Sequence, residues 1–185
     1  MKEKIHKAVE VMKEGGIILY PTDTIWGIGC DATNEEAIKR IYNLKQRIET
    51  KSMLILVENE RMLQNIVEVS SLAWDLIDLS ENPLTIIYDE PKNISKSIIA
   101  DDNTIGIRLV EPIFLKQLIG KLKHPIVSTS ANISGNASPK NFNEISDNIK
   151  HEVDYILDIN TDSNRSKSSS IIKLTKDSKV TIIRK

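Results

Sequence analysis

Four short stretches of the sequence combine residue types that bind small polar or anionic ligands. In the first, Thr22, Asp23 and Thr24 follow a buried apolar run and place two hydroxyl groups around one carboxylate. Polar side chains just beyond a buried strand are where α/β proteins commonly bind ligands. The same residues are also typical of a turn stabilised by side-chain hydrogen bonds, so both interpretations stay open.

The second stretch holds three cations close together at the end of a predicted helix. These are Lys45, Arg47 and Lys51, and a predicted buried strand follows them. Three positive charges in so short a segment indicate an anion site. Cations at the C-terminus of a helix also offset its dipole, which is the structural alternative.

The third stretch is a single arginine in an apolar setting. Arg108 lies within the predicted strand 104–109, where an unpaired cation would be costly. It therefore needs an anionic partner, which is either an internal carboxylate or a ligand.

The fourth stretch is rich in hydroxyl and amide groups. It spans residues 128–135, directly after the buried run at 126–127, and Ser128, Ser130 and Asn132 belong to it. Uncharged donors at the end of a strand suit hydrogen bonding to phosphate or carboxylate, although such a segment on its own is also typical of a turn.

Cations, hydroxyl groups and one acid, brought into one pocket, would suit ATP with Mg²⁺ assisting. The common nucleotide-binding loops are absent, since neither Gly-x-x-x-x-Gly-Lys-Ser/Thr nor Gly-x-Gly-x-x-Gly occurs. There is no Gly-x-Ser-x-Gly elbow, and Cys30 has no evident histidine partner, which argues against acyl hydrolysis by a nucleophile.

Composition narrows the class of protein. The 185 residues suit one domain, 1–185, and the formal net charge of −1 argues against a protein that lives wholly on nucleic acid. No apolar run approaches the roughly 20 residues that a bilayer span needs, so we expect no membrane association and a cytoplasmic protein. The histidines show no metal-ligand spacing, and we expect no fixed metal ligands in the protein.

Helical and strand patterns alternate along the chain, which predicts a mixed α/β (α+β) fold. Helices are predicted near 2–14, 35–44, 60–67, 71–79, 112–123 and 142–150. Strands are predicted near 17–20, 53–57, 84–88, 104–109, 126–127, 154–159, 169–174 and 180–183. The segment 27–29 is interpreted as flexible, 89–103 as a surface loop, Thr33 as the cap of the second helix and Pro112 as the first residue of the fifth.

Three motifs together resemble the YrdC-like family of threonylcarbamoyl-adenylate synthases. They are Pro-Thr-Asp-Thr-Ile-Trp-Gly at 21–27, Lys-x-Arg at 45–47 with Lys51 behind it, and Ser-Ala-Asn at 130–132 followed by Ser-Gly. The likeness runs from about residue 8 to residue 184 and includes the strand with Gly106 and Arg108. It implies an open, twisted mixed sheet with helices around a positively charged concavity.

The resemblance implies an enzyme of tRNA modification. Such an enzyme makes threonylcarbamoyl-AMP and pyrophosphate from L-threonine, bicarbonate and ATP, with Mg²⁺, as a nucleotidyltransferase. Its product reaches tRNA through proteins of a threonylcarbamoyl-transferase complex. This chain resembles the single-domain form of the family.

Residue roles follow from matching the family motifs. Lys45 and Arg47 are implied as the catalytic cations. The residues implied to bind ATP are Lys45, Arg47, Lys51, Thr104, Ser130, Asn132, Ser138 and Arg184. Those implied to bind threonine are Thr24, Arg108, Ser128 and Ser169, with Arg108 on the carboxylate. The motifs also differ from the family, since Ile48 replaces a proline and Ser170 and Lys173 replace a threonine and an aspartate.

Two other functions remain open from the sequence. One is a double-stranded RNA or tRNA-binding module that uses a basic concavity without catalysis. The other is an adenylating carbamoyl-transfer enzyme with a different acceptor, which would fit the nucleotide motifs equally well.

Overall fold

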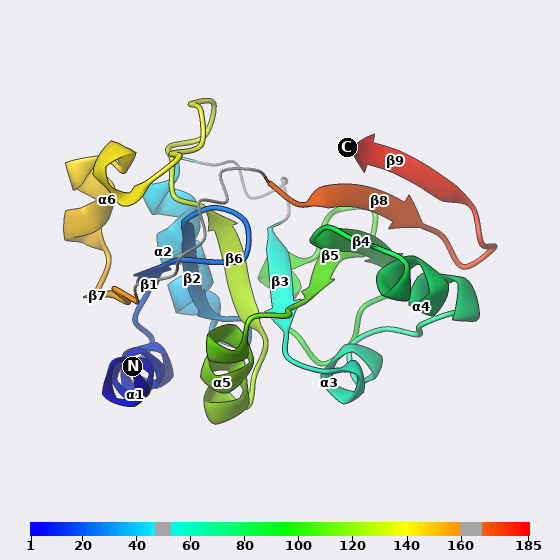
Figure 1. Cartoon of the computed structure of the whole chain (residues 1–185), viewed down its shortest axis with the longest axis horizontal. Coiled ribbons are helices and arrows are strands. Elements are labelled where there is room, and N and C mark those ends of the chain that lie inside the picture. The colour runs from blue at the N-terminus through cyan, green and yellow to red at the C-terminus, as the bar shows by residue number, and fades with distance from the viewer. Residues whose placement is uncertain (47–52, 160–167) are drawn as a thin grey trace.

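The structure is a computed structural model and describes residues 1–46, 53–159 and 168–185. The strands in these ranges form one sheet that crosses the whole molecule (Figure 1). In order across the sheet they are β7 (Tyr155–Ile156), β1 (Ile18–Tyr20), β2 (Gly27–Asp31), β6 (Ile126–Ser130), β3 (Leu54–Val57), β5 (Thr104–Leu109), β4 (Leu84–Asp89), β8 (Ser170–Leu174) and β9 (Val180–Arg184). Parallel and antiparallel pairs both occur, which confirms the predicted mixed fold.

Helices lie against both faces of this sheet. They are α1 (Lys2–Lys13), α2 (Glu35–Leu44), α3 (Glu60–Gln64), α4 (Ser71–Asp78), α5 (Ile113–Leu122) and α6 (Asp147–Glu152), with 3₁₀ turns η1 (Lys96–Ile98) and η2 (Phe142–Glu144). In Figure 1, α1 and α5 lie together below the sheet, and α3 and α4 lie toward the β9 side. No helix of the described ranges is long and apolar enough to cross a bilayer.

Side chains alternate along each strand, so every strand serves both faces. On β3, Leu56 packs with α1 and α5 in one apolar cluster, whereas Ile55 and Val57 belong to the cluster that includes α2, α3 and α4. Arg108 is the register partner of Leu56, and it therefore shares the face on which α1 and α5 pack.

The prediction that the segment 27–29 is flexible is wrong, because these residues form the beginning of β2. Gly27 pairs with Tyr20 on one side and with Ser130 on the other, so its backbone is held by two neighbouring strands. At Gly29 a Cβ would lie 2.4 Å from the Val127 carbonyl oxygen and 2.8 Å from the Tyr20 ring. Glycine is present here because its neighbours approach too closely for a side chain.

The hydroxyl-rich stretch was predicted as a loop after the strand, but β6 continues through it to Ser130. Ser128 pairs with both Gly29 and Leu54, which satisfies its backbone within the sheet. Alternation then points Ser128 and Ser130 to one face of the sheet. The strand thus presents hydroxyl groups at fixed spacing.

The N-cap of α2 and the first residue of α5 lie one residue later in the structure than the sequence predicts. The side chain that caps α2 is that of Asn34, which accepts from the Ala37 amide at 3.0 Å, whereas Thr33 Oγ1 donates to Asp31 at 2.7 Å. Asp31 competes for the threonine hydroxyl, so the cap moves one residue on. Pro112 is the residue before α5 rather than its first residue.

Two longer segments also differ in detail. The predicted surface loop 89–103 contains η1, whose Ile98 is fully buried. The helix predicted near 142–150 is divided into η2 and α6. In both places a polar segment packs against the core through a buried apolar side chain, Ile98 of η1 and Ile149 of α6.

Candidate active site

A cavity of about 240 Å³ opens on the face of the sheet that carries Arg108. Strands and loops from distant parts of the chain supply its lining. The predicted site residues that line it are Thr24, Arg108, Ser128, Ser130, Ser138, Ser169 and Arg184. The tertiary fold therefore gathers all four predicted threonine ligands and three of the predicted ATP ligands in one place, which we call the smaller cavity.

Arg108 is 3% exposed and makes an ion pair inside the protein. Its Nη2 lies 2.9 Å from Asp23 Oδ1, and its Nη1 donates to Thr24 Oγ1 at 3.3 Å. Within the described chain, Arg108 Nε and Asp23 Oδ1 have no hydrogen-bond partner, so the ion pair is a contact of charges without an aligned hydrogen bond. Arg108 keeps a donor available although an internal carboxylate already balances its charge.

In the Thr22–Thr24 turn, the hydrogen bonds fix which hydroxyl group donates and which accepts. Thr22 Oγ1 donates to the Ile25 carbonyl at 2.7 Å, so the contact of 2.9 Å between the two hydroxyl oxygens has Thr24 as its donor. Thr24 Oγ1 in turn accepts from Arg108. The Thr24 hydroxyl is thereby oriented as an acceptor toward the smaller cavity, where it could receive a ligand N–H.

The hydroxyl group of Ser128 is oriented by a hydrogen bond from a buried tyrosine, Tyr20. Tyr20 is fully buried and its hydroxyl donates to Ser128 Oγ at 2.8 Å. Burial raises the pKa of Tyr20 well above its usual value, although the hydrogen bond to Ser128 acts in the opposite direction. Since Ser128 Oγ accepts this bond, its own proton is available to a ligand. The sequence analysis did not assign Tyr20 to the site; its only signal is a hydroxyl at the end of a buried apolar run.

Arg184 reaches the smaller cavity from the edge strand β9. Its Nε and Nη2 donate to the Ser169 carbonyl at 3.0 and 2.8 Å. Ser169 Oγ also lies 2.9 Å from Thr85 Oγ1, a contact that the sequence analysis missed. Burial, and then the positive charge of Arg108, lower the pKa of Arg184. Two arginines that repel each other across one cavity favour an anion between them.

Lys45 lies close to the chain after β6. It is 1% exposed, and its Nζ donates to the carbonyl oxygens of Ser130 and Asn132 at 2.5 and 2.6 Å. In this position Lys45 holds the turn that carries Asn132. Arg47 and Lys51 lie outside the described residues, so the predicted cation loop is described only at Lys45.

Two more predicted ATP ligands do not line the smaller cavity. Asn132 donates from Nδ2 to the carbonyl oxygens of Ile133 and Asn136, while its buried Oδ1 has no partner in the described part of the chain. Thr104 is buried at the far end of β5, where Oγ1 donates to Asp102 at 2.7 Å. Roles for Asn132 and Thr104 in nucleotide binding stay predictions.

The chain is similar to known proteins over nearly its whole length. The family model of the Sua5, YciO and YrdC proteins, described as "Telomere recombination", matches residues 10–185. The chain is 36% identical over 186 residues to a putative threonylcarbamoyl-AMP synthase of Methanocaldococcus jannaschii, covering 98% of this chain and 87% of that protein. It is 31% identical over 163 residues to the threonylcarbamoyl-AMP synthase of Idiomarina loihiensis, covering 86% of each.

A solved structure, P. abyssi Sua5 complexed with L-threonine, superimposes with a TM-score of 0.82 at 25% identity. The alignment covers 94% of this chain and 52% of that one, so this chain spans about half the length of that Sua5. The family match extends over nearly the whole chain, and the nine-stranded mixed sheet agrees with it. The chain belongs to the Sua5/YciO/YrdC family.

Proposed function

We propose that this chain is a threonylcarbamoyl-AMP synthase, which uses L-threonine, bicarbonate and ATP and releases pyrophosphate. The observation that carries the proposal is Arg108, a buried cation that lines the smaller cavity together with a second arginine, Arg184. The names of the relatives favour this enzyme over an RNA-binding module without catalysis.

The smaller cavity has the size and chemistry for the amino acid. About 240 Å³ is below the roughly 300 Å³ at which drug-sized pockets begin, so it suits threonine rather than threonine and ATP together. Arg108 would bind the carboxylate of threonine, and the oriented hydroxyls of Ser128 and Thr24 would bind its remaining polar groups. The nucleotide would extend toward Ser130, Ser138 and the Lys45 segment.

The proposed reaction needs no protein nucleophile. The amine of threonine adds to carbon dioxide with loss of a proton, or to bicarbonate with loss of water, to form a carbamate. A carbamate oxygen then attacks the α-phosphorus of ATP and displaces pyrophosphate. Lys45, Arg47 and Lys51 would neutralise the negative charge that develops on the departing pyrophosphate. Positioning of the two substrates and charge neutralisation would supply most of the rate.

Mg²⁺ would enter bound to the ATP phosphates as part of the substrate. We propose that the phosphates hold it, and in the described ranges no group of three or more His, Cys, Asp or Glu side chains is placed to hold a metal ion without them. Transfer of the product to tRNA through partner proteins, and a cytoplasmic location where ATP and tRNA are present, belong to the same proposal.

The test is threonine-dependent release of pyrophosphate by the purified chain with ATP, Mg²⁺ and bicarbonate. We expect release only when threonine is present, and its loss in the Arg47→Ala variant with a melting temperature changed by only a few degrees. Release that does not depend on threonine, or none under any condition, would refute the proposal. Turnover that requires carbamoyl phosphate in place of threonine would favour the carbamoyl-transfer alternative.

A further inference from the structure

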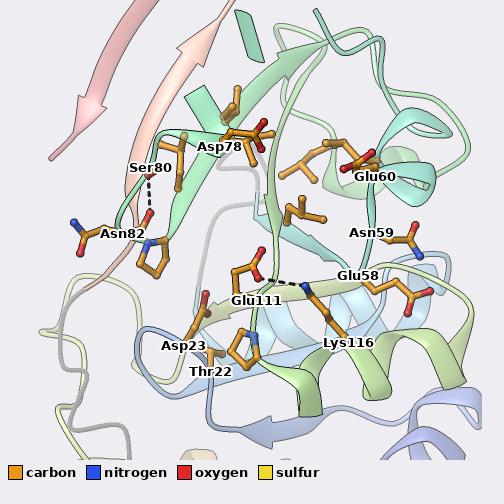
Figure 2. Close-up of a pocket in the computed structure, with 18 of the residues that line it drawn as sticks. Thr22, Asp23, Glu58, Asn59, Glu60, Asp78, Ser80, Asn82, Glu111 and Lys116 are labelled. Atoms are coloured by element: carbon orange, nitrogen blue, oxygen red, sulfur yellow. Dashed lines mark hydrogen bonds and ion pairs between the residues drawn. The ribbon is translucent and has the colours of Figure 1, made fainter. Parts of the chain in front are cut away.

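A second cavity, of about 1280 Å³, opens on the other face of the sheet. It lies between α3, the turn after α4 and the beginning of α5 (Figure 2). Along β4, Leu84, Ile86 and Tyr88 line this cavity, whereas Thr85 lines the smaller one. Strand alternation therefore places the β4 walls of the two cavities on opposite faces of the sheet, and Thr22 lines both cavities. We call the larger one the acidic groove.

Carboxylates dominate the charge of the acidic groove. The acidic lining residues are Asp23, Glu58, Glu60, Asp78, Glu81 and Glu111, and the basic ones are Arg61 and Lys116. Asp23 is paired with Arg108, and Glu111 with Lys116 at 3.3 Å. The other four carboxylates form no ion pair with a described residue. Figure 2 shows acidic side chains on opposite sides of the opening.

The floor of the acidic groove is apolar. Leu84 and Leu109 of the sheet line it together with Ile77 of α4, and all three are only partly buried. At the rim Ile113 is 72% exposed, beside Phe114. An apolar floor beneath a ring of carboxylates suits a ligand that carries both apolar and positively charged groups.

Tyr88 supplies an independent sign of a ligand. Its side chain is 4% exposed and lies on the groove face of β4, yet its hydroxyl has no hydrogen-bond partner in the described chain. A buried hydroxyl without a partner is rare, because it loses its hydrogen bonds to water and gains none in return. A bound segment with polar backbone groups would supply that partner.

We propose that the acidic groove binds a basic, amphipathic segment of a partner protein. Lysine or arginine side chains would contact Glu60, Asp78 and Glu81, and apolar side chains would pack on the floor. The cavity exceeds the range of about 300–1000 Å³ typical of small-molecule sites, which favours a peptide. The carboxylates would repel the phosphates of a nucleic acid.

Binding is tested with a fluorescein-labelled helical peptide of leucine and lysine, in which leucine occupies one helical face. Fluorescence anisotropy with the full chain gives the Kd, and a peptide with glutamate in place of lysine is the charge control. No substrate is present, so the result does not depend on the proposed enzyme activity. We expect saturable binding of the lysine peptide alone, weakening as salt is added.

Matched variants locate the site. Glu60→Gln/Asp78→Asn/Glu81→Gln removes three groove carboxylates and is expected to weaken binding about fivefold to tenfold. Glu3→Gln/Glu14→Gln/Glu152→Gln removes three exposed carboxylates elsewhere and is expected to leave the Kd within about twofold. Ile113→Ser, at an exposed position, is expected to weaken binding by removing apolar contact.

Carbodiimide cross-linking of the bound peptide is expected to join its lysines to Glu58, Glu60 or Glu81. Equal loss of affinity in the two triple variants, or cross-links only outside the groove, would overturn the proposal. So would equal binding of the glutamate peptide, or the absence of saturable binding. Spermine displacing the peptide at an equal concentration would assign the groove to small polycations instead.

Discussion

Arg108 faces two demands at once, because it balances a buried carboxylate and also lines a cavity. Its ion pair with Asp23 is almost completely buried, so neither charge is screened by solvent. Removing one partner of such a pair leaves an uncompensated charge in the interior. The sequence analysis left an internal carboxylate and a ligand as alternatives for Arg108, and the structure supplies the carboxylate without closing the access to a ligand.

Arg108→Ala is expected to raise the threonine requirement by an amount that corresponds to about 2–5 kcal/mol of lost binding. The same change is expected to destabilise the fold by about 3–5 kcal/mol, because Asp23 loses its counter-charge. Pyrophosphate release at varied threonine concentration and thermal unfolding measure the two effects. Arg40→Ala, which breaks the exposed pair with Asp154, is the control and should leave the threonine requirement unchanged. An unchanged requirement in Arg108→Ala would mean that Arg108 serves Asp23 only.

Two buried tyrosines allow a second comparison at the residue scale. Tyr88→Phe removes a hydroxyl without a described partner and is expected to leave the free energy of unfolding unchanged or raise it by about 1 kcal/mol. Tyr20→Phe removes the hydrogen bond to Ser128 and is expected to lower it by about 1 kcal/mol. Urea unfolding of both variants measures the difference. Equal destabilisation by the two changes would show that the Tyr88 hydroxyl has a partner in solution.

At the scale of elements, Asp154 joins three segments that are far apart in the sequence. Its side chain accepts from the Ile17 amide at 2.7 Å, just before β1, and from Arg40 of α2 at 3.1 Å. Burial opposes ionisation of Asp154, but the hydrogen bonds from Arg40 and Ile17 outweigh it and lower its pKa. Because the pKa is lower in the folded state, the ionised form stabilises the fold above the unfolded pKa of 3.8, and this stabilisation is lost as the pH falls through the folded value.

Asp154→Asn is therefore expected to destabilise the protein at pH 7 by about 1 kcal/mol or less, since the group is partly exposed. The difference from the unsubstituted protein should shrink as the pH is lowered below 3.8. Urea unfolding over this pH range measures it. Asp158→Asn, which removes an exposed partner of Lys4, serves as the control and should show a smaller effect at every pH. A difference that persists unchanged at low pH would contradict the role of the Asp154 charge.

At the scale of the whole molecule, the sheet runs without a break from β7 to β9. The smaller cavity is built across it, from the Thr22–Thr24 turn to Arg184 on the edge strand. A site assembled from so many strands requires the sheet to fold as one unit. The prediction of a single domain over 1–185 stays a prediction, and it has a direct test.

The fluorescence of two tryptophans, Trp26 beside β2 and Trp74 in α4, can monitor unfolding in the two halves of the sheet. Trp26 contacts Phe142 at a ring distance of 5.0 Å, and Trp74 lies in α4. We expect Trp26→Phe and Trp74→Phe, each with one remaining tryptophan, to show fluorescence transitions in urea that coincide with the loss of circular dichroism, since one continuous sheet favours two-state unfolding. Separate midpoints for fluorescence and circular dichroism in either variant would indicate two folding units.

The sequence by itself determined most elements and named several of the residues that line the smaller cavity. Apolar periodicity located the strands around 18–20, 54–57 and 104–109, because burial imposes that spacing wherever the chain packs. The charge of Arg108 predicted an anionic partner, since a cation within an apolar strand is costly unless an anion balances it. The motif resemblance added Ser138, Ser169 and Arg184, which line the same cavity. Local pattern failed at 27–29, where glycine is required by the approach of Tyr20 and Val127 from other strands.

Only the tertiary structure decided the partners of these residues. Asp23 and Arg108, Tyr20 and Ser128, and Arg184 and Ser169 are separated along the chain, and no local periodicity relates them. The order of the strands brings them together, because strand pairing sets which side chains share a face of the sheet. The same order, not the motifs, puts the β4 side chains that line the acidic groove on the opposite face of the sheet from Thr85, which lines the smaller cavity.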